Sequence, residues 1–486
     1  LHSRKEYTAM RFFRWGSLAV GVTLIAISAP AAEQGDLPST DTASTRAETN
    51  AGNPDVPRQD ILHRVGHTLH RHDAHHHGHS HTDTQAWIVS DSAAAGGEGD
   101  VAYCDQCGAA DLSPCCEAEE DEAWSLFDDM IDLPLLDDWG FSAGGWLSQG
   151  FTWNPDSPDN RFNTPIRFND RANEYQLNQL YFYLERPVNT EGSNWDVGGR
   201  FDLLFGTDAR FTKALGLDDD IAGSRFYTLA LPQLYGEVFA PVGRGLSVKF
   251  GHFYTIIGYE VVPAPDNFFY SHAYTMLYAE PFTHTGFLAS YPLSDQVTVH
   301  GGLTRGWDNF DDPANDLGFL GGVNWTSCDE RTTLAFAITT PDDDVPGNDG
   351  DRTMYSIVGT RKLTDKLTYV IQHDLGWQDD GAPGGDDAEW YGVNNYLLYD
   401  INDCWAAGMR FEWFRDDDAA RVPSSTGAAF AGNYFGYTFG LNYKPNANVI
   451  VRPEVRWDWT NGGISPFDDD TDSNAFTAGF DVILRY

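Results

Sequence analysis

From about Ser142 to the last residue, hydrophobic and polar positions alternate along the chain in segments of about 8 to 15 residues. The segment VIVRPEVRWDW, at 449–459, places valines and tryptophans at every second position and charged residues at most of the others. Successive side chains of a strand point to opposite faces, so each such segment predicts a two-faced β-strand. The final run, 476–486, follows the same pattern and ends on the aromatic Tyr486.

The spacing of these segments predicts their arrangement. We expect sixteen strands, at 142–153, 174–186, 195–206, 231–240, 245–255, 281–291, 296–306, 318–325, 332–339, 354–362, 366–376, 389–399, 405–415, 432–443, 448–459 and 475–486. Long connections follow the odd strands, and short ones such as PVGR, PLSD and KPNA follow most even strands. The sequence therefore predicts an all-β fold, an antiparallel transmembrane β-barrel of about 16 strands, with short turns and both termini in the periplasm.

The apolar faces indicate lipid rather than a protein core as their neighbour. A soluble β-sandwich also alternates, but its strands are usually shorter. Here aromatic residues gather near the strand ends, as the interface girdles of an outer-membrane barrel require. We therefore expect 476–486 to be a lipid-facing last strand, and its terminal aromatic is typical of such barrels.

The N-terminal part has a different composition. Residues 1–31 combine arginines, an apolar run and an Ala-x-Ala site, which predicts a signal peptide and an outer-membrane location. Residues 32–138 are rich in small, acidic and histidine residues and predict a mostly disordered periplasmic extension. Within it, Trp124, Phe127 and Ile131 recur at helical spacing and predict a short amphipathic helix. Residues 139–486 form the predicted barrel.

Charge and composition exclude some functions. The net charge of −41 argues against a nucleic-acid partner, because binding phosphates requires clustered Lys and Arg. An outer-membrane enzyme would need a nucleophile beside a histidine, but the histidines at 252, 284, 300 and 373 are scattered and no nucleophile motif accompanies them. We therefore expect no enzyme activity.

One stretch carries a family resemblance. The pattern G-x-F-x-x-x-x-G-x-E at Gly251 to Glu260, the region from Asn267 to Ser271 and the HTG at 284–286 resemble the OmpL-like beta-barrel porin family found in planctomycete-type bacteria. The resemblance covers about 142–486. It implies passive diffusion of small hydrophilic solutes or ions through the outer membrane, with no cofactor and no catalytic residues. Porins of this strand number are often homotrimers.

A barrel of this size can enclose an aqueous channel whose selectivity depends on its inward charges. The connection at 256–280 is more aromatic and less acidic than the other long loops, which suits a segment folded into the pore. We expect its Glu260 and Asp266 to face inward basic residues across a constriction. The alternative is that these charges only pair with one another. The full predicted pore-lining set is Glu260, Asp266, Arg410, Glu412, Arg452, Glu454, Arg456 and Asp481, and the acidic loops favour cations.

Two clusters in the extension could carry other chemistry. Nine histidines lie at 63–81, and neutral imidazoles suit divalent Zn, Cu or Ni. The candidate ligands are His72, His75, His76, His77, His79 and His81, although a low-complexity spacer explains the tract equally well. A barrel that serves only as an anchor for this tract is the alternative function. Four cysteines at 104–116 favour disulfides over zinc in an oxidising compartment, with the pairing of Cys328 and Cys404 left open.

Overall fold

The computed structural model describes residues 124–127, 138–311, 317–340, 350–427 and 430–486. The chain divides into two compact units, Leu1–Gly78 and His79–Tyr486, and all described residues belong to the second unit. No helix within these described ranges is long and apolar enough to cross a membrane.

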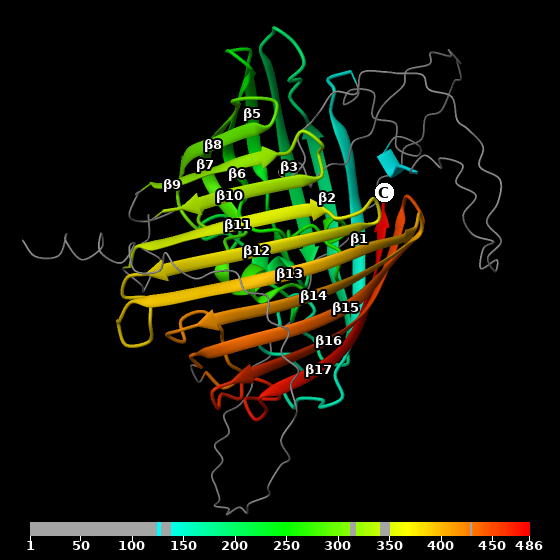
Figure 1. The fold of residues 1–486 in the computed structure, drawn as a ribbon, viewed down its shortest axis with the longest axis vertical. Coiled ribbons are helices and arrows are strands. Elements are labelled where there is room, and N and C mark those ends of the chain that lie inside the picture. The colour runs from blue at the N-terminus through cyan, green and yellow to red at the C-terminus, as the bar shows by residue number, and fades with distance from the viewer. Residues whose placement is uncertain (1–123, 128–137, 312–316, 341–349, 428–429) are drawn as a thin grey trace, which may run out of the picture. The chain divides into compact units, whose positions relative to one another are not determined.

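The described part is a closed antiparallel β-barrel (Figure 1). Its strands are β1 (Ser142–Trp153), β2 (Tyr175–Arg186), β3 (Asp196–Gly206), β4 (Thr228–Ala230), β5 (Leu234–Ala240), β6 (Leu246–Tyr254), β7 (Thr283–Pro292), β8 (Val297–Thr304), β9 (Gly318–Thr326), β10 (Thr332–Thr339), β11 (Arg352–Lys362), β12 (Leu367–Gln378), β13 (Ala388–Asn402), β14 (Trp405–Asp416), β15 (Gly432–Asn446), β16 (Val449–Asn461) and β17 (Asn474–Arg485). Each strand pairs with its neighbours, and β1 pairs with β17 to close the sheet. Because β3 pairs with both β4 and β5, the seventeen strands fill sixteen positions, and the predicted barrel is confirmed.

The fourth strand position differs from the prediction of a continuous strand at 231–240. The structure has two pieces there, β4 and β5, separated by residues 231–233. Pro232 explains the break, because proline has no N–H to donate to a sheet ladder. The other strands lie within a few residues of their predicted bounds.

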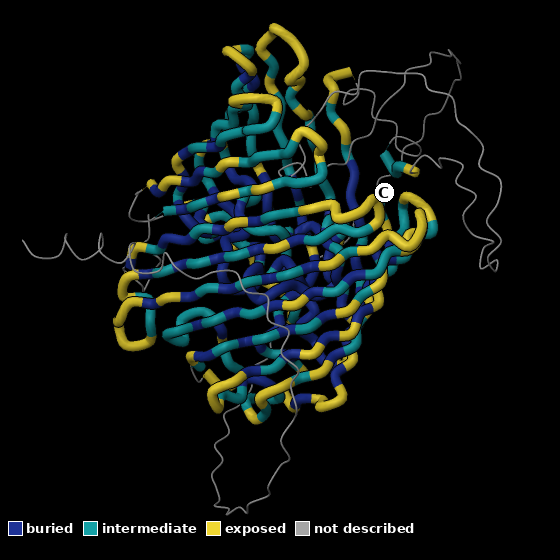
Figure 2. Tube along the Cα trace, viewed as in Figure 1, coloured by how far each residue is buried: buried dark blue, intermediate teal, exposed yellow. Residues whose placement is uncertain are grey.

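The two faces of the barrel wall follow the alternation seen in the sequence. On β16, Arg456 and Asp458 point inward and are each 1% exposed, whereas the outward Trp457 is 54% exposed. Exposed and buried positions alternate in this way along many strands (Figure 2). A continuous outer band of apolar side chains matches a surface that contacts hydrocarbon.

The seam between the first and last strands involves the C-terminal residue. Tyr486 exchanges two backbone hydrogen bonds with Gly145, of 2.9 and 3.0 Å. A Cβ on Gly145 would lie 2.0 Å from the carbonyl oxygen of Tyr181, so only glycine fits there. Phe127 packs its ring 6.5 Å from that of Tyr486 and 5.6 Å from that of Phe182. The segment 124–127 therefore contacts the barrel beside the seam; Ile131 of the predicted helix lies outside the described residues.

The connection between β6 and β7, residues 255–282, folds into the barrel, and we refer to it as the inserted loop. It contains two short helical turns, η2 (Ala264–Asp266) and η3 (Thr275–Ala279). Every residue of η3 is buried. Met276 and Leu277 join an apolar cluster that also contains Trp146 of β1 and Trp390 of β13. The loop thus packs inside the barrel, as its aromatic composition predicted.

Candidate functional site

The inserted loop is held against one wall of the barrel by charged side chains. We call the inner faces of β12 to β17 the loop-covered wall. Glu260 of the loop accepts a hydrogen bond of 2.7 Å from the guanidinium of Arg410 on β14. Arg410 also donates to the carbonyl oxygen of Ser271, again at 2.7 Å. Arg410 is fully buried, so this ion pair is shielded from solvent.

Arg452 on β16 makes the second attachment. It pairs with Asp481 on β17, with nitrogen–oxygen distances of 2.9 and 2.6 Å. Its Nη1 nitrogen donates to the carbonyl oxygens of Ala264 and Asn267 in the loop at 2.8 and 2.7 Å. One guanidinium therefore satisfies a carboxylate of the wall and two backbone groups of the loop.

Arg456 lies four residues after Arg452 on the same inward face of β16, and it makes the third attachment. It pairs with Asp458 at 2.7 Å and with Glu412 at 3.1 Å, and it donates to the carbonyl oxygen of His272 at 2.8 Å. Glu412 accepts the backbone N–H of Tyr274 at 2.6 Å. The carboxylates of the wall thus accept hydrogen bonds from loop N–H groups, while the arginines donate hydrogen bonds to loop carbonyl oxygens.

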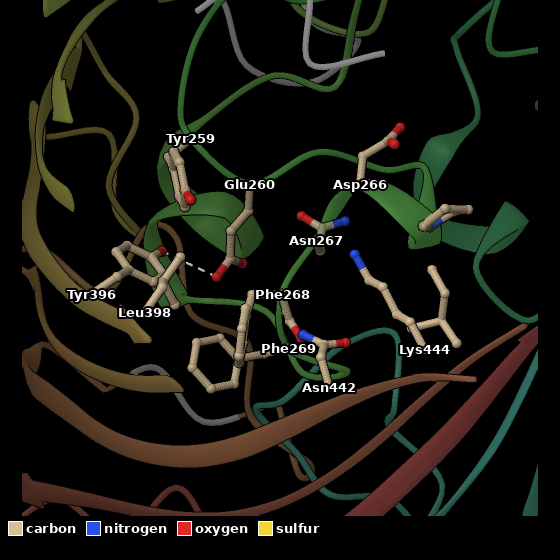
Figure 3. Close-up of a pocket in the computed structure, with 12 residues that line it drawn as sticks. Tyr259, Glu260, Asp266, Asn267, Phe268, Phe269, Tyr396, Leu398, Asn442 and Lys444 are labelled. Atoms are coloured by element: carbon tan, nitrogen blue, oxygen red, sulfur yellow. Dashed lines mark hydrogen bonds between the residues drawn. The ribbon is translucent and has the colours of Figure 1, made fainter. Parts of the chain in front are cut away.

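Glu454 and Asp266 complete the predicted set. Glu454 accepts the backbone N–H groups of Tyr270 and Ser271 at 3.0 and 3.1 Å. Asp266 forms an ion pair of 4.0 Å with Arg485. It borders a cavity of 140 Å³ that is also lined by Tyr259 and Lys444 (Figure 3).

The position of Glu260 sets its acidity. Burial alone would raise the pKa of its carboxyl group, but Arg410 and His272, together with the N–H of Ala273, outweigh it and lower the pKa to about 2. Glu260 is therefore ionised throughout the neutral range. The hydroxyl group of Tyr396 also donates a hydrogen bond of 3.0 Å to this carboxylate.

The geometry bears on the two alternatives left open by the sequence. The wall residues predicted to line the pore are Arg410, Glu412, Arg452, Glu454, Arg456 and Asp481, and none is more than 6% exposed. All of them except Asp481 form hydrogen bonds with the loop, so no gap for a solute separates these five from it, and Asp481 pairs with Arg452. This burial supports the interpretation in which these charges pair with one another and hold the loop.

Other charges, not singled out in the sequence analysis, remain in contact with solvent. Glu185 on β2 and Arg200 on β3 form an ion pair of 2.9 Å with side chains 28% and 10% exposed. Glu237 on β5 lies opposite Lys249 on β6, and both are partly exposed. We call these four residues, with the buried Asp202, the second charged wall. The alternation of polar and apolar residues along a strand predicts which side chains face inward, but it does not show which wall the loop covers.

The histidines of the enzyme alternative do not assemble a site. His252 hydrogen-bonds Thr285, and His284 hydrogen-bonds Thr255. His373 lies on a lipid-facing position of β12. Among the described residues, no group of three or more His, Cys, Asp or Glu is arranged to hold a metal. The histidine tract at 63–81 lies outside the described residues.

The two cysteines of the barrel turns behave differently. Cys328 is a free, exposed thiol. Cys404 is disulfide-bonded. The two therefore do not pair with each other; the cysteines at 104–116 lie outside the described residues.

These features define an outer-membrane β-barrel of the porin type: sixteen strand positions, short turns at one end, long loops at the other and one long loop folded inside. The model of the beta-barrel porin-2, OmpL-like family matches residues 140–486. The chain belongs to this family. Porins of this family are typically channels without enzymatic activity.

Several solved structures are similar to this chain. OprB of Pseudomonas putida matches with 13% identity and a TM-score of 0.49, covering 74% of this chain and 97% of that one. An anion-selective porin from Comamonas acidovorans matches with 7% identity and a TM-score of 0.48, covering 71% and 99%. OmpT of Vibrio cholerae matches with 12% identity and a TM-score of 0.47, covering 71% and 97%. No curated protein matches the sequence.

Proposed function

We propose that this porin allows passive diffusion of small hydrophilic solutes or ions along the second charged wall. The observation that carries the proposal is the contrast between the two walls. Arg452 and Lys249 both lie a few residues from a short turn, yet Arg452 is buried under the inserted loop and Lys249 is partly exposed. The partial exposure of Lys249 supports a water-filled route along this wall, which a solute would follow.

The charges on this route support a preference for cations. The second charged wall holds three carboxylates, Glu185, Asp202 and Glu237, against two basic groups, Arg200 and Lys249. Arg200 pairs with both Glu185 and Asp202, and Glu237 lies opposite Lys249 on the neighbouring strand. Charged groups on a pore wall tune selectivity even when they are paired.

Single-channel conductance in a planar bilayer tests the proposal. The folded full chain should give discrete conductance steps and a reversal potential that favours cations in a salt gradient. Lys249→Glu should increase that preference, because it reverses a charge on the proposed route. Lys366→Glu, in the exposed turn between β11 and β12, is the matched control and should leave selectivity nearly unchanged. A folded barrel without conductance steps would refute the diffusion pathway.

One observation favours the alternative that the barrel is an anchor for the histidine-rich segment. The inserted loop contributes Met276, Leu277 and Tyr278 to the apolar cluster inside the barrel, and each is 2% exposed. Such packing narrows the lumen. The same conductance measurement separates the two functions, since an anchor with a filled lumen passes no current.

Two further features belong to the proposal. The family resemblance supports a homotrimer, and the docking of Trp124 at the short-turn end of the barrel supports a periplasmic position for the extension. Asn448, in the turn between β15 and β16, accepts the N–H of Trp124 at 2.9 Å and donates to its carbonyl oxygen at 2.6 Å. Divalent metal binding by the histidine tract would then occur on the periplasmic side.

A further inference from the structure

A pair of buried carboxyl groups lies where the end of the inserted loop meets β12, apart from the arginines that hold the loop. Glu280, near the end of the loop, is 5% exposed, and Asp374 on β12 is fully buried. The two carboxyl groups lie within hydrogen-bonding distance of each other. The side-chain amide of Gln372 donates to both of them, at 2.9 Å in the case of Asp374.

Neither carboxyl group of this pair forms an ion pair with a basic residue among those that the structure describes. Burial and the charge of Asp374 raise the pKa of Glu280 well above its usual range, and Glu260 adds to this effect. Glu260 itself, by contrast, has a full ion pair with Arg410. Two carboxylates in a low-dielectric site must either share a proton or bind a cation.

Buried oxygen atoms without a hydrogen-bond partner lie on the strands on either side of β12. Ser356 faces Asp374 across the β11–β12 pairing, and Asn394 faces Gln372 across the β12–β13 pairing. Ser356 Oγ approaches Asp374 but completes no hydrogen bond of normal geometry. Asp374 Oδ1 and Asn394 Oδ1 likewise have no partner among the described residues. All three residues are at most 2% exposed, so bulk water does not solvate these atoms.

We propose that Glu280 and Asp374 bind one Ca²⁺ ion, with Ser356 and Asn394 as neutral oxygen ligands. Hard cations take carboxylate, hydroxyl and amide oxygens, which are the groups present here. Two carboxylates neutralise one divalent ion. Ca²⁺ fits better than Mg²⁺, because Mg²⁺ keeps several of its waters and demands octahedral geometry.

The site would tie together both ends of the inserted loop. Glu280 packs against Gly258 so closely that a Cβ on Gly258 would lie 1.9 Å from its Oε2 atom. Gly258 also has a φ of +88°, which favours glycine. An ion held by Glu280 and Asp374 therefore links the beginning of the loop, its end and the barrel wall.

The test is the Ca²⁺ dependence of thermal unfolding, measured on the full chain folded in detergent after chelator treatment. Wild-type protein should unfold about 5 °C higher at a hundredfold excess of Ca²⁺ over its dissociation constant. Glu280→Gln and Asp374→Asn should lose this shift. Asp308→Asn is the matched control and should keep it. Asp308 is partly buried at this end of the loop, and it accepts the backbone N–H groups of Phe282 and Thr283 instead.

Three outcomes would overturn the proposal. An equal Ca²⁺ shift in wild type and Glu280→Gln would place the effect on the acidic surface loops. No Ca²⁺ shift in wild type, with an unfolding temperature that falls as the pH rises above about 5, would mean that the pair shares a proton. If the variants do not fold, terbium luminescence of wild type decides: a signal that Ca²⁺ does not displace is the overturning result. None of these readouts depends on conductance, so the diffusion proposal stands or falls separately.

Discussion

Replacing Arg410 by methionine tests whether the buried ion pairs hold the inserted loop in place. Arg410 contacts Glu260, Glu412, Ser271 and Thr438, and its side chain is fully buried. Methionine fills a similar volume but removes the charge and every hydrogen bond. Glu260 would then remain buried without its principal cation, which is the costly part of the change.

The size of the effect follows from the acidity of Glu260. Its pKa falls from 4.5 to about 2 in the folded protein, largely because of Arg410. At about 1.4 kcal/mol per unit, this corresponds to roughly 3 kcal/mol of favourable interaction. Breaking a buried pair by removing one partner usually costs about 3–5 kcal/mol, which agrees. We therefore expect Arg410→Met to lower the free energy of unfolding by about 3 kcal/mol.

Denaturant unfolding of the folded barrel, followed by tryptophan fluorescence, measures this change. Arg415→Met on the same strand is the matched control. Arg415 pairs with Asp417, which directly follows β14, and the side chain of Arg415 is 27% exposed. Exposed pairs contribute at most about 1 kcal/mol. The double variant Arg410→Met with Glu260→Gln should recover part of the loss, since no buried charge is left alone. Equal effects of Arg410→Met and Arg415→Met would refute the reasoning.

Further predictions address the acid range, the pore and the termini. Because the pKa of Glu260 is depressed, its contribution to stability is complete above about pH 4.5 and disappears as the pH falls towards 2, so acid titration of the unfolding midpoint should show a loss only there. Glu237→Gln should weaken cation preference in a reversal-potential measurement. Maleimide should label Cys328 in the folded protein without reductant, while Cys404 should stay unlabelled until reduction. Deleting Tyr486 should reduce the yield of folded barrel, measured by heat-modifiable mobility, because the seam loses two backbone hydrogen bonds.

The strands could be predicted from the sequence because two independent signals coincide in them. Alternation fixes which residues share a face, and the alternation of long and short connections fixes the order. The alternation predicted a continuous strand through 231–233, but the structure has a break there. Pro232 cannot donate a hydrogen bond to the neighbouring strand. The two-residue alternation shows only whether a side chain points into the barrel or towards lipid. It carries no information on which residues lie across the lumen from it.

The candidate site was harder to predict for that reason. Arg410, Arg452 and Arg456 were correctly placed on the inner face, but their distance from the inserted loop depends on how far the loop crosses the lumen. Three arginines donating to loop carbonyls could not be anticipated, because backbone carbonyls leave no trace in the sequence. Glu280 was equally hidden, since its partner Asp374 lies 94 positions away on a strand that alternation marks only as inward-facing.

The buried charges are better understood as specifying the loop position than as stabilising the barrel. Taking arginines and carboxylates out of water is costly, and apolar side chains could fill the same space at similar stability. An apolar interface would, however, tolerate a shifted loop. Here each arginine needs both a wall carboxylate and a loop carbonyl, as Arg452 does with Asp481 and Ala264. Any other register leaves a buried charge unpaired, so the network selects one loop position and with it one shape of the remaining lumen.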